Sequence, residues 1–427
     1  MKTSRLPGFY KLSVEDRLKI VKEFADLTGE ELELLKQGGL TVSLADKMIE
    51  NVIGVFSLPL AVAVNFLINS KDYLVPMAIE EPSVVAAASH AAKLMREGGG
   101  IKASSTPPVM IGQVQLIKVP DIAEAKEQIL SHKGEILEIA NAQSKTLVKL
   151  GGGAIDLQVR EIFTSRGAML LAELLVDCRD AMGANIVNTM CEAIAPTLER
   201  LSKGKALLRI LSNLADRRLA RAEAVIPKKE LGGEEIVEGI VDAYALAASD
   251  PYRAATHNKG IMNGIIAVAL ATGQDTRALE AGAHAYAART GRYQPLSKWE
   301  VTEGGDLKGS LELPLAVGIV GGATRAHPLA RLSLKILGVK TANELAEVMC
   351  SVGLAQNLAA LRALVTEGIQ RGHMKLHARN LALSAGAPEH LVDLIVERML
   401  REKNISLSRA KEILRELAES SENSQDG

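Results

Sequence analysis

The chain has 427 residues, which is enough for two or three domains and a sizeable core. Hydrophobic residues make up 47% of it but aromatic residues only 3%, which favours close packing of aliphatic helices over an aromatic-rich β-sandwich. A formal net charge of −1 provides no overall basic field for nucleic acid, and three cysteines without metal-ligand spacing argue for a reducing compartment and against a disulfide or zinc framework.

The amino-terminal segment is predicted to be mainly helical. Amphipathic patterns indicate helices at 13–27 and 29–37, and another at about 43–53. The apolar run 51–68 is shorter than the ~20 residues that span a bilayer and contains Pro59, so we interpret it as a buried helix and turn. The first residues lack the apolar core of a signal peptide. We therefore expect a soluble, cytoplasmic protein.

Residues 107–215 change to a pattern of strands and helices. The predicted elements are a strand at 108–119, a long helix at 121–150, two hairpin strands at 154–163 and 167–177, a helix at 180–201 and a strand at 205–213. This βαββαβ order is typical of a ferredoxin-like sheet with helices on one face. The segment interrupts the domain that surrounds it.

The predicted fold class is therefore α+β. A mainly helical large domain is expected from 1–106 and 216–372, with the small ferredoxin-like domain inserted between them, and 373–427 form a charged helical tail. In the second half of the large domain we predict helices at 234–249, 258–271, 275–290 and 341–367, and a strand within 309–324.

A polar cluster in the stretch "PYRAATHNKGIMNG" indicates a site. Asn258 is a plausible N-cap, which would place Lys259 in the first turn of a helix, where the dipole disfavours an ammonium by a few tenths to ~1 kcal/mol. A lone exposed lysine is tolerated there, but this one has polar neighbours. Asp275 opens the next helix and could balance the charge only if the chain folds back, because the starts of two such antiparallel helices lie ~20 Å apart. The polar neighbours are Arg253, Thr256, His257 and Asn263.

Glu81 is a second candidate, at the amino end of an Ala-rich helix that begins near Pro82. The simplest interpretation is an acid that stabilises the helix start. A proton donor must hold its proton at neutral pH, and the helix dipole opposes this unless apolar burial and another carboxylate outweigh it. The neighbouring Glu80 leaves the choice between the two residues open.

Two histidines and three glycine-rich stretches complete the candidates. His373 and His377 share a helical face, but "HExxH" and a third ligand are missing, so we expect no metal and instead one acid–base and one binding histidine. The glycine runs at 98–100, 151–153 and 318–322 match neither GxGxxG nor GxxxxGK[ST], which excludes Rossmann and P-loop sites. The strand–helix turn 180–185 suits a dinucleotide pyrophosphate, with a purely structural turn as the alternative.

Six motifs carry a resemblance to a known family. In chain order they are "ENVIG" (50–54), "EEPSVVAAAS" (80–89), "DAMGAN" (180–185), "DPYRAATHNKGIMNG" (250–264), "GIVGGAT" (318–324) and "GIQRGHMKLHARN" (368–380). Over almost its whole length the chain resembles the class II 3-hydroxy-3-methylglutaryl-coenzyme A (HMG-CoA) reductases. The resemblance implies a thioester reduced twice, with two NAD(P)H, to mevalonate and free coenzyme A. Some relatives run the reaction oxidatively.

The resemblance also implies roles for residues. Lys259 would stabilise the oxyanion, Glu81 would handle protons, Asp275 would hydrogen-bond to both, and His373 would protonate the coenzyme A thiolate. The implied substrate contacts are Glu50, Asn51, Ser83, Arg253, Thr256, Asn263, Asn357 and His377. The implied cofactor contacts are Ser144, Lys145, Asp180, Met182, Gly183, Ala184, Asn185, Gly321 and Gly322.

Three further expectations follow from the resemblance. A flap hinged near Gly372 would close and deliver His373, and a homodimer or an oligomer of dimers would share its active sites between subunits. An NADH-specific relative carries an aspartate before the triple glycine, where Ser144 and Lys145 stand here, so both cofactors should be used, with NADPH tolerated or preferred. The alternatives are another acyl-CoA or aldehyde oxidoreductase with the same nucleotide domain, or a non-catalytic helical binding protein.

Overall fold

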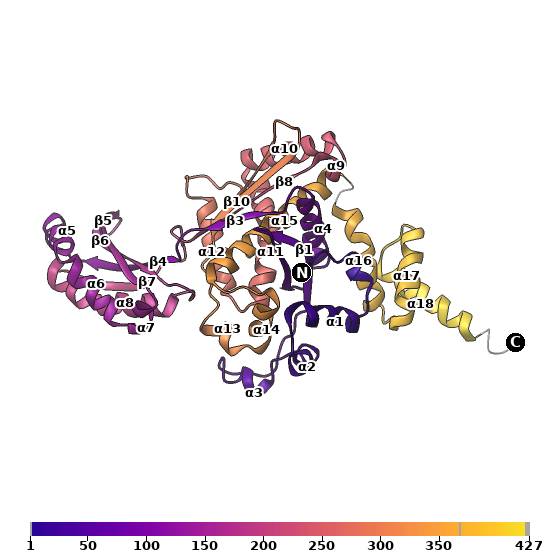
Figure 1. The fold of residues 1–427 in the computed structure, drawn as a ribbon, viewed down its shortest axis with the longest axis horizontal. Coiled ribbons are helices and arrows are strands. Elements are labelled where there is room, and N and C mark those ends of the chain that lie inside the picture. The colour runs from indigo at the N-terminus through magenta and orange to yellow at the C-terminus, as the bar shows by residue number, and fades with distance from the viewer. Residues whose placement is uncertain (1, 367–368, 423–427) are drawn as a thin grey trace.

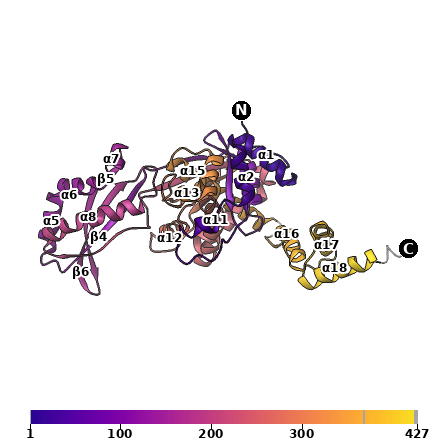
Figure 2. The same ribbon diagram turned by 90° about the horizontal axis from the view of Figure 1, so that it is seen from below.

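The computed structural model describes the backbone of residues 2–366 and 369–422, without the side chains of 323, 369–376, 389 and 418–422. Figure 1 shows three parts in a row: a small α/β part, a central large domain and a group of carboxy-terminal helices. The view in Figure 2 shows the same order, with the small part and the carboxy-terminal helices at opposite ends. The expected α+β class is confirmed.

The large domain contains two antiparallel sheets. The hairpin of β1 (Leu60–Ile68) and β2 (Lys71–Ala78) is one of them. The other has the order β3-β8-β10-β9, which joins segments from both sides of the small domain. Its strands are β3 (Lys102–Ser105), β8 (Leu219–Ile226), β10 (Leu307–Pro314) and β9 (Ser297–Val301).

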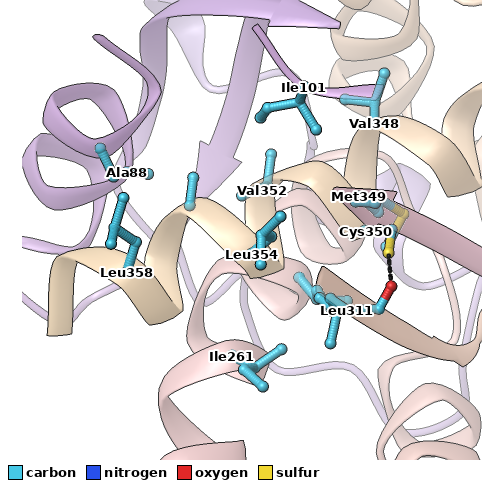
Figure 3. Packing of buried hydrophobic residues seen from close by; sticks show 14 of the residues in the cluster. Ala88, Ile101, Ile261, Leu311, Val348, Met349, Cys350, Val352, Leu354 and Leu358 are labelled. Carbon is cyan, nitrogen blue, oxygen red and sulfur yellow. Dashed lines mark hydrogen bonds between the residues drawn. The ribbon is translucent and has the colours of Figure 1, made fainter. Parts of the chain in front are cut away.

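Helices surround these sheets, and α15 (Ala342–Val365) is the buried centre. Figure 3 shows its apolar side chains between Ile101, Ile261 and Leu311 from other elements. Among the described residues, α15 is long and apolar enough to cross a membrane, but 67% of its most apolar window is buried, as in the core helix of a soluble protein. The other helices are α1 (Val14–Ala25), α2 (Gly29–Gln37), α3 (Val42–Ala45), α4 (Val84–Glu97), α9 (Lys228–Leu231), α10 (Glu234–Ser249), α11 (Pro251–Ala271), α12 (Thr276–Ala287), α13 (Gly322–Ala326) and α14 (Pro328–Leu337).

The small domain has the predicted βαββαβ arrangement. Its sheet has the order β5-β6-β4-β7, every neighbouring pair is antiparallel, and a separate apolar core lies between the sheet and its helices. The elements are β4 (Val109–Ile117), α5 (Ile122–Ser131), α6 (Lys133–Ala142), α7 (Lys145–Lys149), β5 (Gly153–Thr164), β6 (Gly167–Asp177), α8 (Ala184–Ser202) and β7 (Lys205–Leu211).

Three helices follow the large domain: α16 (Ile369–Ser384), α17 (Glu389–Arg401) and α18 (Leu407–Glu422). They share a small apolar core of their own, which includes Ile395, Met399 and Ile413. Gly372 lies inside α16, so a hinge at this residue would have to break a continuous helix. The junction with the large domain instead falls between the end of α15 and the start of α16.

Three predictions of local structure are wrong. The run 51–68 is not a helix: β1 occupies its second half, because Val62, Val64 and Phe66 give it β-branched and aromatic side chains that suit a strand. The helix expected at 43–53 is reduced to the single turn of α3. The long helix at 121–150 is divided into α5, α6 and α7, and the Ser144 side chain caps the last of these.

Candidate active site

A cavity of about 510 Å³ opens between α4, α11 and the end of α15. Its size is in the range of small-molecule sites, and its wall combines aliphatic side chains with a few polar ones. The polar side chains that sequence analysis selected and that line it are Glu81, Ser83, Arg253, Thr256, His257, Lys259, Asn263 and Asn357. Residues 170 or more positions apart in the chain are thus brought to one surface.

An ion pair stands at this cavity. Lys259 Nζ donates to Glu81 Oε2 at 2.9 Å, and Asn263 Nδ2 donates to the same oxygen at 3.2 Å. Lys259 and Asn263 are four residues apart on α11, so they share one helical face. The side chains of Lys259 and Glu81 remain 61% and 35% exposed, which leaves both head groups accessible to a ligand.

The predicted reason for the position of Lys259 is wrong. Helix α11 begins at Pro251, and Asp250 caps it by accepting from the Arg253 amide at 2.7 Å. Lys259 is therefore in the third turn, beyond the reach of the dipole at the helix start. Asn258 does not cap a helix, since its buried side chain donates to the Gln294 carbonyl and accepts from the Leu296 amide. Lys259 is balanced by Glu81 rather than opposed by a helix end.

Glu81 is not a helix-capping residue either. Helix α4 starts at Val84 with Ser83 as its N-cap, and Ser83 has a left-handed φ of 74° and makes no capping bond with its side chain. A non-glycine residue in this region is strained, a feature that is common at binding sites. The Ser83 side chain is thus not engaged at the helix start and lies at the cavity wall.

Asp275 does not reach this ion pair within the chain. Its Oδ1 caps α12 by accepting from the amides of Arg277 and Ala278, both at 3.1 Å, and it forms an ion pair with Arg277 at 3.2 Å. Lys259 lies about 18 Å along α11 from the end of the helix, and Asp275 comes after that end. The fold-back that would bring Asp275 to Lys259 in the same chain does not occur.

A hydrogen-bond network that sequence analysis missed supports the cavity wall. Trp299 Nε1 donates to Asn357 Oδ1 at 2.7 Å, and Ser297 Oγ donates to the same oxygen at 2.8 Å. The indole N–H can only donate, so it fixes which end of the Asn357 amide is oxygen and leaves Nδ2 as the free donor. His257 Nε2 bonds to Ser297 Oγ at 2.6 Å, which requires the N–H on Nε2.

His257 is 2% exposed, and burial, together with the charge of Arg253, lowers its pKa from 6.5 to about 4. The unfolded chain takes up a proton as the pH falls below about 6.5, whereas the folded chain does not until about pH 4, so the neutral histidine stabilises the fold only at higher pH. As the pH falls from 7 to 5, we expect protonation of this residue in the unfolded chain to lower the free energy of unfolding by about 2 kcal/mol. In urea unfolding, His257→Gln should show a smaller fall in midpoint between these pH values than the unsubstituted protein; equal falls would contradict the assignment.

The predicted cofactor residues fall into two groups, of which the first lies at the junction of the small and large domains. Ala181 in the turn 180–185 forms a β-bridge with Val320, next to Gly321 and Gly322 at the start of α13. Asp180 faces inward: its carboxylate accepts from the Ala342 amide at 2.8 Å, and so supports the turn. The remaining turn residues are Met182, Gly183, Ala184 and Asn185.

The second group lies at the triple glycine. Ser144 caps α7, and Lys145 is exposed at its first position. Arg179, which was not predicted, donates to the Gly151 carbonyl and so links the triple glycine to the turn that follows β6. Arg179 has a positive φ of 50°. The sequence carries no signal for its contact with Gly151.

Four predicted residues lie away from the cavity or outside the described side chains. Glu50 and Asn51 are exposed in the segment between α3 and β1 and do not line the cavity. His377 is exposed on α16 and does not line it. His373 is on the same helix, but its side chain is outside the described part of the structure. Among the described residues, no group of three or more His, Cys, Asp or Glu side chains could hold a metal ion.

Comparisons with known proteins bear on this geometry. The sequence model for hydroxymethylglutaryl-coenzyme A reductase matches residues 13–378. A reductase of this name from Archaeoglobus fulgidus is 60% identical, over 97% of this chain and 95% of its own length. The chain belongs to the HMG-CoA reductase family. A Borreliella burgdorferi protein described as a probable HMG-CoA reductase is 35% identical, over 92% of this chain and 90% of its own.

Solved structures of HMG-CoA reductases agree with this assignment. The enzyme from Streptococcus pneumoniae matches with a TM-score of 0.83 and 47% identity, covering 96% of this chain and 99% of that one. A second structure of that enzyme, of class II and bound to NADPH in open conformations, matches with a TM-score of 0.82 over 84% of this chain and 99% of that one. As a family member, the chain is an oxidoreductase that reduces HMG-CoA to mevalonate and coenzyme A with NAD(P)H.

Proposed function

We propose that the Glu81–Lys259 ion pair is the catalytic centre of this thioester reduction. The observation that carries the proposal is the 2.9 Å contact between these residues at the wall of the cavity. Hydride addition to a thioester carbonyl creates an oxyanion, and the ammonium of Lys259 is placed to stabilise it. Glu81, held by Lys259 and Asn263, handles the proton that the oxygen gains or loses.

The remaining polar wall binds the acyl portion. Arg253 and Thr256 lie one turn apart on α11 and offer a cation and a hydroxyl for the carboxylate of the hydroxymethylglutaryl group. Ser83 and the fixed Nδ2 of Asn357 provide two further donors. When the C–S bond of the hemithioacetal breaks, the sulfur leaves as a thiolate with a free-thiol pKa of about 8.5, and His373 supplies its proton.

The turn 180–185 is proposed to bind the dinucleotide. NADPH supplies the hydride in each of the two reductive steps. Gly183, the N-cap of α8, has no side chain to pair the N–H groups of the first turn, so these donors are open to a pyrophosphate. The glycines 321 and 322 lie beside this turn on the large-domain side. The most direct test is HMG-CoA-dependent oxidation of NADPH with stoichiometric release of free thiol and mevalonate as product; absence of thiol release would reject the function.

Cofactor preference is proposed to depend on α7. Ser144 is uncharged and Lys145 is cationic, so nothing at these two positions repels a 2′-phosphate, and NADPH is preferred while NADH is also accepted. Ser144→Asp is expected to lower kcat/KM for NADPH by about ten-fold while changing that for NADH little, through like-charge repulsion. Aspartate is also a good N-cap, so α7 should persist. Equal losses with both cofactors would contradict this role for α7.

The chain is proposed to act as a homodimer, or an oligomer of dimers, with shared active sites. The segment between α3 and β1 carries Ile53 and Phe56 almost fully exposed, beside Glu50 and Asn51. Such apolar exposure in an extended segment fits a contact with a second copy. In that arrangement Asp275 of the partner subunit completes the Glu81–Lys259 pair, and Glu50 and Asn51 approach the partner's substrate.

The same proposal includes the domain limits and the cellular location. The large domain comprises 1–106 and 216 to the end of α15, the nucleotide-binding domain 107–215, and the flap α16 to α18, whose helices carry their own core. Closure of the flap brings His373 to the cavity, and His377 with it, while water is excluded. A cytoplasmic location is consistent with the three free cysteines, Cys178, Cys191 and Cys350.

A further inference from the structure

Arg218 is a buried cation at the junction of the two domains. It lies just before β8, where the chain returns from the small domain to the large one, and it is only 4% exposed. Burial lowers the pKa of its guanidinium to about 10, so the group is still charged at neutral pH. Within residues 2–366 and 369–422 no carboxylate forms an ion pair with it. A buried charge is costly unless its donors are satisfied.

Backbone carbonyl groups satisfy this guanidinium. Arg218 Nη1 donates to the carbonyls of Ala181 and Met182, both at 3.1 Å, and Nη2 donates to the Val317 carbonyl at 2.5 Å. The first two carbonyls belong to the turn 180–185 of the small domain. The third belongs to the large-domain loop that leads to Gly321 and Gly322. One side chain therefore ties together the two loops assigned to the dinucleotide.

These bonds also determine where the turn directs its N–H groups. In a trans peptide the C=O and N–H groups point in opposite directions. Because Arg218 draws the Met182 carbonyl inward, the Gly183 N–H points away from the guanidinium. Gly183 is the uncapped start of α8, and no protein acceptor for its N–H occurs among the described residues. The Gly183 N–H thus points away from the fixed positive charge of the guanidinium.

The junction leaves little room for the turn to shift. A Cβ on Gly318 would lie 2.5 Å from the Met182 amide nitrogen, so the two loops are in direct contact there. The Ile319 amide donates to the Asp180 carbonyl at 2.9 Å on the other side of the same contact. The Arg218 guanidinium bonds to carbonyl groups of both loops and so holds them in this contact.

We propose that Arg218 is a positioning residue for the dinucleotide. It holds the turn 180–185 against the large domain in the orientation that receives the pyrophosphate, without touching the cofactor itself. The proposal rests on the proposed function, since it takes this turn to be the dinucleotide loop. It predicts that loss of the guanidinium weakens cofactor binding much more than binding of HMG-CoA, whose cavity lies at Glu81 and Lys259.

Steady-state kinetics with both substrates test this separation. In Arg218→Met, KM for NADPH is expected to rise by about ten-fold or more, because charge-assisted hydrogen bonds that orient the loop are lost. KM for HMG-CoA should change by less than about two-fold, which also reports that the large domain is folded. Arg218→Lys keeps the charge but cannot reach three carbonyls. Its KM for NADPH should therefore lie between that of the unsubstituted protein and that of Arg218→Met.

Arg217→Met is the matched control, because this neighbouring arginine is exposed and its removal should leave both KM values unchanged. Equal increases in both KM values, or no increase for NADPH, would overturn the proposal. If Arg218→Met does not fold, Arg218→Lys decides the question. A fluorescence titration with NADPH alone separates the two hypotheses: weaker binding in the Arg218 variants supports this inference even if the HMG-CoA assay fails, and unchanged binding rejects it even if that assay succeeds.

Discussion

Lys259→Ala is expected to lower kcat by about 10²–10³-fold while the protein stays folded. The ammonium is the cation that contacts Glu81 at the cavity, and its loss removes the proposed stabilisation of the oxyanion. The fold should tolerate the change, since the side chain is 61% exposed and alanine favours the interior of α11. The measurement is HMG-CoA-dependent NADPH oxidation, with the thermal unfolding midpoint recorded on the same preparation.

A matched control is Lys126→Ala, which removes an exposed lysine from a helix of the small domain, far from the cavity. Its activity should equal that of the unsubstituted protein. Near-normal turnover in Lys259→Ala would reject the catalytic role of this residue. A loss of activity accompanied by a large fall in the unfolding midpoint would show instead that Lys259 supports the structure.

Lys259 also shows how far the sequence alone leads. Its motif and its polar neighbours were sufficient to select it, because a polar cluster between two apolar helices indicates a site. The helix boundary was misjudged, although Asp250 followed by Pro251 is a common helix start. The sequence favours Asn258 as a cap. In the structure this residue lies in the middle of α11, and hydrogen bonds to the segment before β9 bury its side chain.

The strands of the large domain show a different limit. In β8, Ala220, Ala222 and Ala224 are buried while Arg221 and Glu223 are exposed, so the strand does alternate. Alanine is a poor strand former and a good helix former, which hid this alternation in an Ala-rich chain. Its place in the sheet depends on pairing with β10, almost ninety residues later, and with β3. Local pattern cannot supply such partners.

The support of the site was equally hidden. Ser297 and Trp299 orient Asn357, yet each is an ordinary residue in its own segment. His257 belongs to the polar cluster in the sequence, but its bond to Ser297 could not be predicted from it. Their bonds join positions 40 to 60 residues apart and require the fold to be known. Arg218 is similar, because only the structure shows that its partners are carbonyl groups of two distant loops. Sequence motifs therefore selected the side chains that we propose to react, but not the groups that hold them.

The second large expected effect is recovery of activity in mixed dimers, and it tests whether Asp275 comes from the partner subunit. Asp275→Asn and Lys259→Ala are each expected to be nearly inactive, yet mixed dimers of the two should recover about half of the normal activity. If Asp275 of the partner subunit completes each site, one site of the mixed dimer carries both defects and the other carries neither. Asparagine is a good N-cap, so α12 should be preserved. Two affinity tags and tandem purification would isolate the mixed dimer.

The control for this experiment pairs Lys259→Ala with Glu81→Gln. These two residues contact each other within one chain, so every site of that mixed dimer is defective and no activity should return. Recovery in the first pair and none in the second requires a site built from two subunits. If neither pair recovers, Asp275 acts inside its own chain and must travel from beyond the end of α11, a movement that would break its present bonds to Arg277 and Ala278. The geometry favours a second subunit, because association can bring Asp275 to the cavity with its cap on α12 intact.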